Sequence, residues 1–167
     1  MGNVFGVFVE TILLVLFLWC INFISIMVHE LGHVLAYVLE VKDNNWSIEI
    51  GTGKKLIETS RFRIHLKVFS GYFTPKITEY SSNKKAIIIL LGGPIASSIA
   101  MLLLLIIVFS ADVDAQNLIS PSAANFILYY ALIYNAVLFI VSSLPTKRSI
   151  LKGYVSDGYK IRKILSE

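Results

Sequence analysis

The chain has 167 residues, 56% of them hydrophobic, with a mean hydropathy of +0.72. This composition is far more apolar than that of an ordinary soluble domain and excludes that class. The length fits one compact domain covering residues 1–167, and there is no internal repeat or low-complexity tract. The net charge of +4 is small. The positions of the basic residues are explained by membrane topology, so we expect no nucleic acid as a partner.

Three apolar segments are long enough to cross a bilayer. Residues 4–28 are interrupted mainly by Glu10, and residues 86–109 and 123–144 carry no charge. Each reaches the roughly 20 residues that a spanning helix needs. We expect the first helix to continue to about residue 39, beyond the length of a bilayer crossing. It has neither a basic leader nor a cleavage site, so we interpret it as a retained helix. The fold class that follows is an all-α membrane protein with a three-transmembrane-helix core.

The basic residues predict the orientation of these helices. Nine of the 15 Lys and Arg lie in residues 42–85 and six in residues 147–163, whereas residues 1–41 and 86–146 have none. Basic residues near spanning helices favour the cytoplasmic side. We therefore expect a multi-pass integral membrane protein with its N-terminus outside and its C-terminus in the cytoplasm. A bacterial plasma membrane is the simplest setting for so small a chain.

The segment between the first two helices, residues 42–83, has the pattern of β-structure. Residues 47–50 alternate in polarity, and Gly51-Thr52-Gly53 has the composition of a turn. Residues 61–68 then alternate strictly between polar and apolar side chains. We expect a small β-hairpin or sheet that lies at the cytoplasmic membrane surface.

The second helix carries the run Gly92-Gly93-Pro94. Gly92 and Ala96, like Gly93 and Ser97, are four residues apart. Small residues at this spacing let membrane helices approach closely, and Pro94 should bend or locally open the helix. Two interpretations stay open: this run serves packing alone, or it lies beside an active site.

The motif with the clearest chemistry is His29-Glu30-Leu31-Gly32-His33. Positions i and i+4 share one face of a helix, so two imidazoles can bind one metal ion. The glutamate between them is placed to act as a general base. Zinc suits two nitrogen ligands, a further protein ligand and an open position, and we expect one Zn²⁺ per chain. The competing interpretation is a polar patch at the inner interface, where these side chains meet water.

The third ligand must come from elsewhere in the chain. The motif is expected near the cytoplasmic end of the first helix, so a ligand on the same side of the membrane is favoured. Asp157 meets this condition, because it follows the third helix in the cytoplasmic segment 145–167. Gly158 beside it allows a close backbone approach. His65 stays open as an alternative, although it shares a strand face with basic residues. The other acidic candidates are Glu10, Glu40, Asp112 and Asp114. Of these, Asp112 and Asp114 lie on the outer side, and Glu10 lies about five turns too far along the first helix.

These motifs resemble the site-2 protease family of intramembrane zinc metalloproteases, peptidase family M50. The resemblance rests on the motif from His29 to His33, the Gly92-Gly93-Pro94 helix and Asp157-Gly158, in the family's order. It implies a three-helix catalytic core with a small sheet between the first two helices. It also implies zinc held by two histidines and one aspartate, and cleavage of transmembrane substrates near the cytoplasmic side. Nothing in the chain resembles a PDZ domain.

One departure from the family concerns the third helix. The family shows Asn-x-x-Pro before its Asp-Gly, whereas this chain has Ser142 at the Asn position before Pro145. Asn135, two turns earlier on roughly the same face, is our candidate for that catalytic role, with Ser142 as the alternative.

The expected function is hydrolysis of peptide bonds in transmembrane or membrane-anchored proteins, with Glu30 as the general base. Residues 61–68 would assist by pairing with an extended substrate segment. Two other functions stay open: a non-proteolytic membrane zinc hydrolase, and a non-enzymatic regulatory or immunity protein of the membrane.

Overall fold

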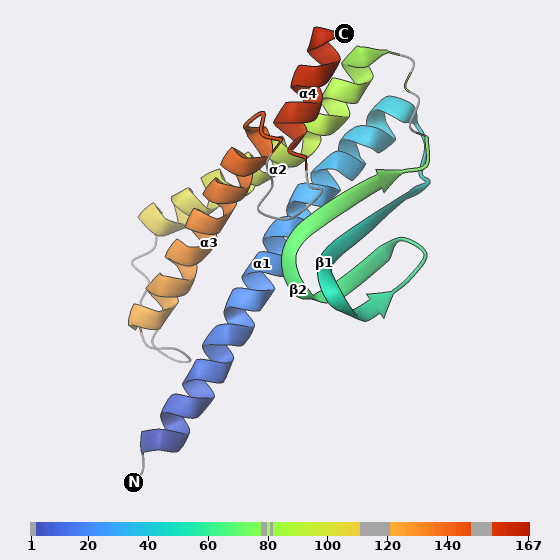
Figure 1. Cartoon of the computed structure of the whole chain (residues 1–167). Coiled ribbons are helices and arrows are strands. Elements are labelled where there is room, and N and C mark those ends of the chain that lie inside the picture. The colour runs from blue at the N-terminus through green and yellow to red at the C-terminus, as the bar shows by residue number, and fades with distance from the viewer. Residues whose placement is uncertain (1–2, 78–79, 81, 111–120, 148–154) are drawn as a thin grey trace.

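The structure is a computed structural model that describes residues 3–77, 80, 82–110, 121–147 and 155–167. These residues form four helices and a two-stranded antiparallel sheet. In chain order the elements are α1 (Asn3–Val41), β1 (Trp46–Glu58), β2 (Phe62–Pro75), α2 (Asn83–Ser110), α3 (Pro121–Ser143) and α4 (Asp157–Ser166). The two ends of the chain lie at opposite ends of the molecule (Figure 1).

Three of the helices are long and apolar enough to cross a membrane. The stretches are Val4–Val41, Asn83–Ser110 and Ala124–Ser143, and an 18-residue window in each has a mean hydropathy of 2.6, 2.4 and 1.9. They agree with the segments expected from the sequence. Helix α1 has 39 residues, which gives a length of about 58 Å. This is nearly twice the roughly 30 Å hydrocarbon core of a bilayer, and the first turns of α1 extend past the ends of α2 and α3 (Figure 1).

Helices α1 and α2 pack through their glycines. A Cβ added to Gly32 would collide with the carbonyl of Gly92, and one added to Gly92 would collide with the carbonyl of Gly32. The two backbones are therefore in direct contact, as small residues allow between membrane helices. Helix α3 packs mainly against α2 and also contacts α1, and α4 packs against α2 and α3.

The sheet is a strongly bent hairpin. At the open end of the hairpin, where β1 begins and β2 ends, Trp46 pairs with Pro75 and Ile50 pairs with Gly71. Ile50 also pairs with Ile64. The expected turn at residues 51–53 is wrong, because β1 continues through them to Glu58. Gly51 and Gly53 have φ angles of 81° and 86°, values that favour glycine. They bend the strand where a turn was expected, and β1 and β2 are joined at residues 59–61.

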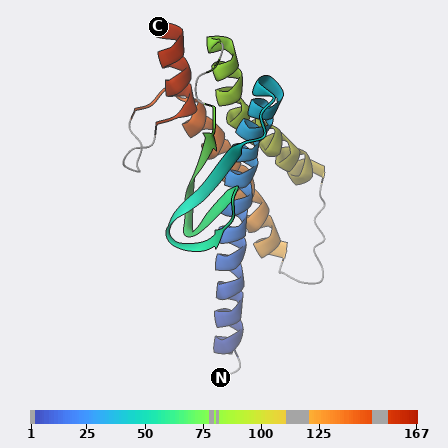
Figure 2. The same ribbon diagram turned by 90° about the vertical axis from the view of Figure 1, so that its right-hand side faces the viewer.

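The hairpin lies along α1 and not across its C-terminal end (Figures 1 and 2), and its expected place at the cytoplasmic membrane surface stays a prediction. Nε1 of Trp19 donates to the carbonyl of Leu66 at 2.8 Å, and further along the helix Tyr37 contacts the ring of Phe73. These contacts cover about 27 Å of α1. The physical reason is an apolar cluster that joins the helix to the sheet, made of Ile26, Val34, Ile48, Ile50 and Val68.

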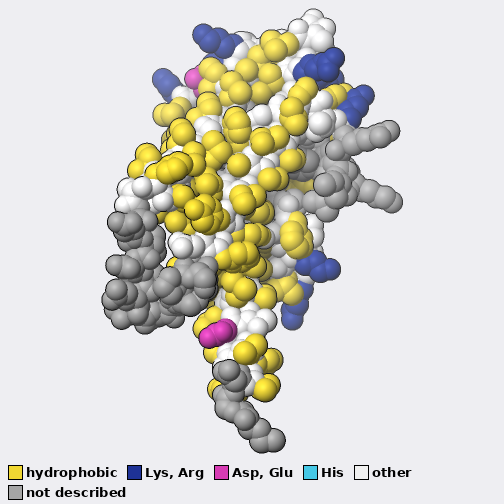
Figure 3. Space-filling model, turned by 90° about the vertical axis from the view of Figure 1, so that its left-hand side faces the viewer, with side chains coloured by type: hydrophobic (Ala, Val, Ile, Leu, Met, Phe, Trp, Pro, Cys, Tyr) yellow, Lys and Arg dark blue, Asp and Glu magenta, His cyan; other side chains and the backbone are white. Residues whose placement is uncertain are grey.

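Hydrophobic side chains cover the long face shown in Figure 3, whereas Lys and Arg side chains gather at its upper end and lie along its right-hand edge. Apolar side chains on α1, α2 and α3 remain exposed along most of their length. A soluble domain of this size does not leave so continuous an apolar surface. The surface therefore fits a protein surrounded by lipid.

Candidate metal centre

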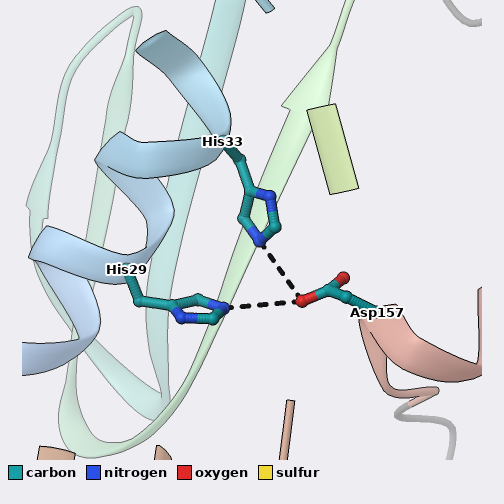
Figure 4. A group of neighbouring side chains, drawn as sticks. All are labelled: His29, His33 and Asp157. Atoms are coloured by element: carbon teal, nitrogen blue, oxygen red, sulfur yellow. Dashed lines mark ion pairs between the residues drawn. The ribbon is translucent and has the colours of Figure 1, made fainter. Parts of the chain in front are cut away.

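Two histidines of α1 and one aspartate at the start of α4 converge inside the bundle. Nε2 of His29 lies 3.5 Å from Oδ2 of Asp157, and Nε2 of His33 lies 3.3 Å from the same oxygen. Figure 4 shows both rings directed at this carboxylate. All three side chains are buried. Their donor atoms lie within 4.8 Å of one another and form one enclosed group.

Contacts between the end of α3 and the start of α4 place Asp157. Ser156 is the N-cap of α4, and its hydroxyl donates to the carbonyl of Leu144 at 2.6 Å. Gly158 lies so close to the carbonyl of Ser143 that no side chain fits between them. The chain after α3 is thereby returned to the bundle, and the candidate third ligand meets the two histidines.

Helix α2 holds the opposite nitrogens of both rings. Nδ1 of His29 lies 2.8 Å from Oγ of Ser97, and Nδ1 of His33 lies 2.8 Å from the carbonyl oxygen of Ile89. A carbonyl only accepts, so Nδ1 of His33 carries a proton, and Nε2 is the ring nitrogen left to face Asp157 or a metal. The N–H of Gly93 also lies 3.3 Å from this Nδ1, but the shorter carbonyl contact decides the tautomer. Such partners orient histidines that bind metals.

The Gly92-Gly93-Pro94 run is involved both in packing and in the site. Gly92 packs on α1, as described above. A Cβ on Gly93 would lie 2.6 Å from Nε2 of His29 and closer still to Nε2 of His33. Gly93 therefore keeps the space beside both nitrogens open. Helix α2 continues through Pro94.

The donor set and its spacing suit a zinc ion. Two imidazole nitrogens and one carboxylate oxygen are usual zinc ligands. Ligand atoms about 2.0–2.1 Å from a tetrahedral zinc are roughly 3.3 Å from each other. The nitrogen-to-oxygen separations of 3.5 and 3.3 Å match this value. Because Gly93 leaves the adjacent space unfilled, these three residues fit the ion.

Glu30 lies beside this group and lines a cavity of about 770 Å³. Its side chain is buried, and Gly71 of β2 packs directly against it. His33 and Asp157 line the same cavity, and most of its other lining residues are apolar residues of β2, α2 and α4. A molecule bound in this cavity would therefore have a carboxylate, a histidine and an aspartate within reach.

A third side chain also contacts Asp157. Nζ of Lys160 lies 3.2 Å from Oδ1 of Asp157. Burial alone would raise the pKa of the Asp157 carboxyl, but hydrogen bonds from His29 and His33 and the charge of Lys160 hold this pKa well below its usual range. The carboxyl is therefore ionised at neutral pH, the state that binds a metal.

His65, the alternative third ligand, is not brought to this group. Its Nδ1 lies 3.0 Å from the carbonyl of Gly53, and its Nε2 lies 3.0 Å from Oε1 of Glu49. His65 therefore belongs to a polar network within the hairpin.

Asn135 is buried on α3, and its amide nitrogen donates to Oγ of Ser25 at 2.9 Å. Ser25 lies one turn before His29 on α1. Oδ1 of Asn135 has no hydrogen-bond partner among the described residues. Ser142, the alternative, donates to the carbonyl of Phe139 in its own helix.

Sequence reasoning missed several contributors to this site. Ser97 lies four residues after Gly93, in the run for which packing and a place beside an active site both stayed open, and it was not named as a partner of His29. Lys160 follows Asp157 by three residues, which places both on one helix face. The contact between these two side chains could therefore have been predicted from the sequence. The carbonyl of Ile89 has no sequence signal, and the contact of Gly71 depends on where the hairpin docks.

A bundle of membrane helices that buries two histidines, an aspartate and a glutamate beside one cavity has the arrangement of a membrane metallohydrolase. The family comparison is more specific. The model for Peptidase family M50 matches residues 16–161, so this chain belongs to Peptidase family M50, the site-2 protease family of intramembrane metalloproteases. No match was found among the curated proteins or the solved structures.

Proposed function

We propose that this chain is an intramembrane zinc protease that cuts membrane-anchored proteins near the cytoplasmic side. His29, His33 and Asp157 would hold one zinc ion. The observation that carries the proposal is the meeting of these three donors in one buried group, of which His33 and Asp157 line a cavity together with Glu30. Family membership supports the reaction class.

Glu30 would move the proton in this reaction. Zinc, when bound, supplies a Lewis acid that polarises a carbonyl and makes water more acidic. The Glu30 carboxylate would accept a proton from the attacking water and then deliver it to the nitrogen of the leaving amine. Gly71 and the hairpin restrict Glu30 to this side of the cavity.

Asn135 would bind the substrate beside the metal. It reaches from α3 to Ser25, one turn from His29, and has an unpaired oxygen within the described residues. Its amide could hold a substrate backbone group if the bond to Ser25 exchanged. Ser142 is the weaker candidate, because its hydroxyl already serves its own helix.

A substrate helix hides its carbonyl groups in its own hydrogen bonds, so it must be locally unwound before cleavage. An extended segment can pair with a sheet edge. The residues of the hairpin that line the cavity include Gly71, Phe73 and Pro75. Residues 61–68 are not among the residues that line it. We therefore move the proposed pairing to the end of β2. Proline substitution there, with cleavage and zinc content measured together, tests it; unchanged cleavage would remove this step.

The proposed orientation places the C-terminus of the chain in the cytoplasm. The basic residues of α4 and of the start of α2 support it, because positive charge favours that side. The lipid bilayer and a membrane-anchored protein are the expected partners, and nucleic acid is not.

Purified protein and a membrane-anchored test substrate in proteoliposomes provide the decisive experiment. Wild type should bind one zinc and cut the substrate, and Glu30→Gln should keep the zinc and lose cleavage. His29→Ala should lose both.

Other outcomes would favour the other functions. Zinc binding without cleavage of any membrane-anchored protein would favour a non-proteolytic zinc hydrolase. Zinc content that is absent in wild type and unchanged by His29→Ala would favour a non-enzymatic regulatory or immunity protein.

A further inference from the structure

We propose that Lys160 is a positioning residue that fixes the orientation of the Asp157 carboxylate for metal binding. This inference rests on the proposed zinc site. It assigns a function to a cation of α4 that takes no part in the proton transfer described above.

The two oxygens of Asp157 have different partners. Oδ2 faces Nε2 of His29 and Nε2 of His33, at 3.5 and 3.3 Å. Oδ1 faces Nζ of Lys160, at 3.2 Å. One oxygen is thus directed at the metal position, and the other is held from the opposite side.

The carboxylate needs such a partner because its own torsion does not fix it. The χ2 angle of aspartate is broad and has no sharp staggered minima. The N-cap contacts of Ser156 and the close packing of Gly158 set the backbone of Asp157, but not the rotation of the carboxylate. A cation on the remaining oxygen restricts that rotation.

The charges around the site also support a role for Lys160. Glu30 and Asp157 are both buried and line one cavity, and two carboxylates in such surroundings repel each other. Lys160 lies three residues after Asp157 on the same helix, a spacing at which side chains meet. It brings positive charge to the edge of the site while its side chain stays 50% exposed. An ion pair with one partner so exposed adds little to global stability, so positioning and folding can be tested separately.

The test uses the full chain in detergent micelles and two metal probes. Zn²⁺ affinity is measured by competition with a chromophoric chelator, and Co²⁺ absorption reports the ligand geometry. The variants are Lys160→Ala, Lys160→Arg and the control Arg162→Ala. Arg162 is an exposed cation of the same helix, and the ion pairs of Asp157 are with His29, His33 and Lys160. Thermal unfolding of the metal-free proteins checks their folding.

Lys160→Ala should weaken Zn²⁺ binding by about 10- to 100-fold, as loss of a partner of a metal ligand typically does. It should also change the Co²⁺ spectrum, with unfolding close to that of wild type. Lys160→Arg should restore both, and Arg162→Ala should behave as wild type. Equal Zn²⁺ affinity in wild type and Lys160→Ala would overturn the inference, as would an equal loss in Arg162→Ala. If wild type itself held no zinc, the proposed metal site would fail together with this inference, a result distinct from a failure confined to Lys160.

Discussion

Gly93 of α2 lies so close to His33 of α1 that a methyl group on Gly93 would overlap Nε2 of the ring. The same methyl would lie 2.6 Å from Nε2 of His29. The glycine therefore defines the space next to both nitrogens, and the spacing of two helices is tied directly to the candidate metal centre.

Gly93→Ala should abolish zinc binding. The added methyl would occupy the space of the ligand nitrogens, and His33 cannot move away freely because Ile89 holds its other nitrogen. Zinc content of the purified protein is the measurement. Gly6→Ala makes the same change in α1, where a Cβ meets nothing within 4 Å, and it should bind zinc as wild type does. A Gly93→Ala protein with full zinc content would show that the metal lies elsewhere.

Ser97→Ala should weaken zinc binding by about 10- to 100-fold, the usual effect of removing the hydrogen-bond partner of a ligating histidine. The hydroxyl of Ser97 lies 2.8 Å from Nδ1 of His29 and is fully buried. Ser98→Ala is the matched control, because the hydroxyl of Ser98 donates to Ile95 within its own helix. The two variants are compared by zinc titration. Equal affinities would mean that Ser97 does not orient the ring.

Asn135→Ala should lower kcat for a membrane-anchored substrate while zinc content stays at that of wild type. Asn135 meets α1 one turn from the histidines but is not among the metal donors. Ser142→Ala should have the smaller effect, because Ser142 binds its own helix. Rates at saturating substrate, with zinc measured on the same samples, separate the two residues. A larger loss in Ser142→Ala would reverse the assignment.

The sequence predicted the elements that depend on local pattern. The long apolar runs predicted the three long helices because their length and lack of charge are properties of each segment alone. The i, i+4 spacing of His29 and His33 required only a helix. Asp157 was reached through membrane sidedness, and the structure brings it to the two rings.

The docking of the hairpin could not be predicted in the same way. Alternation in residues 61–68 indicated a strand, but not which surface the strand would cover. That choice depends on how Ile26 and Val34 of α1 fit the sheet face that carries Ile48. The bend at Gly51 was likewise taken for a turn, because glycine permits a positive φ in either setting.

Helix α4 meets α1 through the side chain of Asp157, whereas its backbone packs on α2 and α3. A metal held by His29, His33 and Asp157 would therefore clamp α4 to α1. Removing zinc with a chelator should release this clamp, and the amides of α4 should exchange hydrogen faster. Amides of the hairpin should change little, because β1 and β2 are held by their own ladder and by the apolar cluster on α1. Hydrogen exchange followed by mass spectrometry resolves the two regions.

Asp157→Ala in the presence of zinc should reproduce the exchange pattern of chelated wild type, because it removes the same link from the other side. A ligand that binds only the closed form stabilises it by about 2.7 kcal/mol at a concentration 100 times its Kd. This corresponds to about a 100-fold change in the opening equilibrium of α4, well within what exchange rates detect. Equal protection of α4 with and without zinc, in protein shown to bind the ion, would mean that Asp157 is not a ligand. The third donor would then have to come from another element.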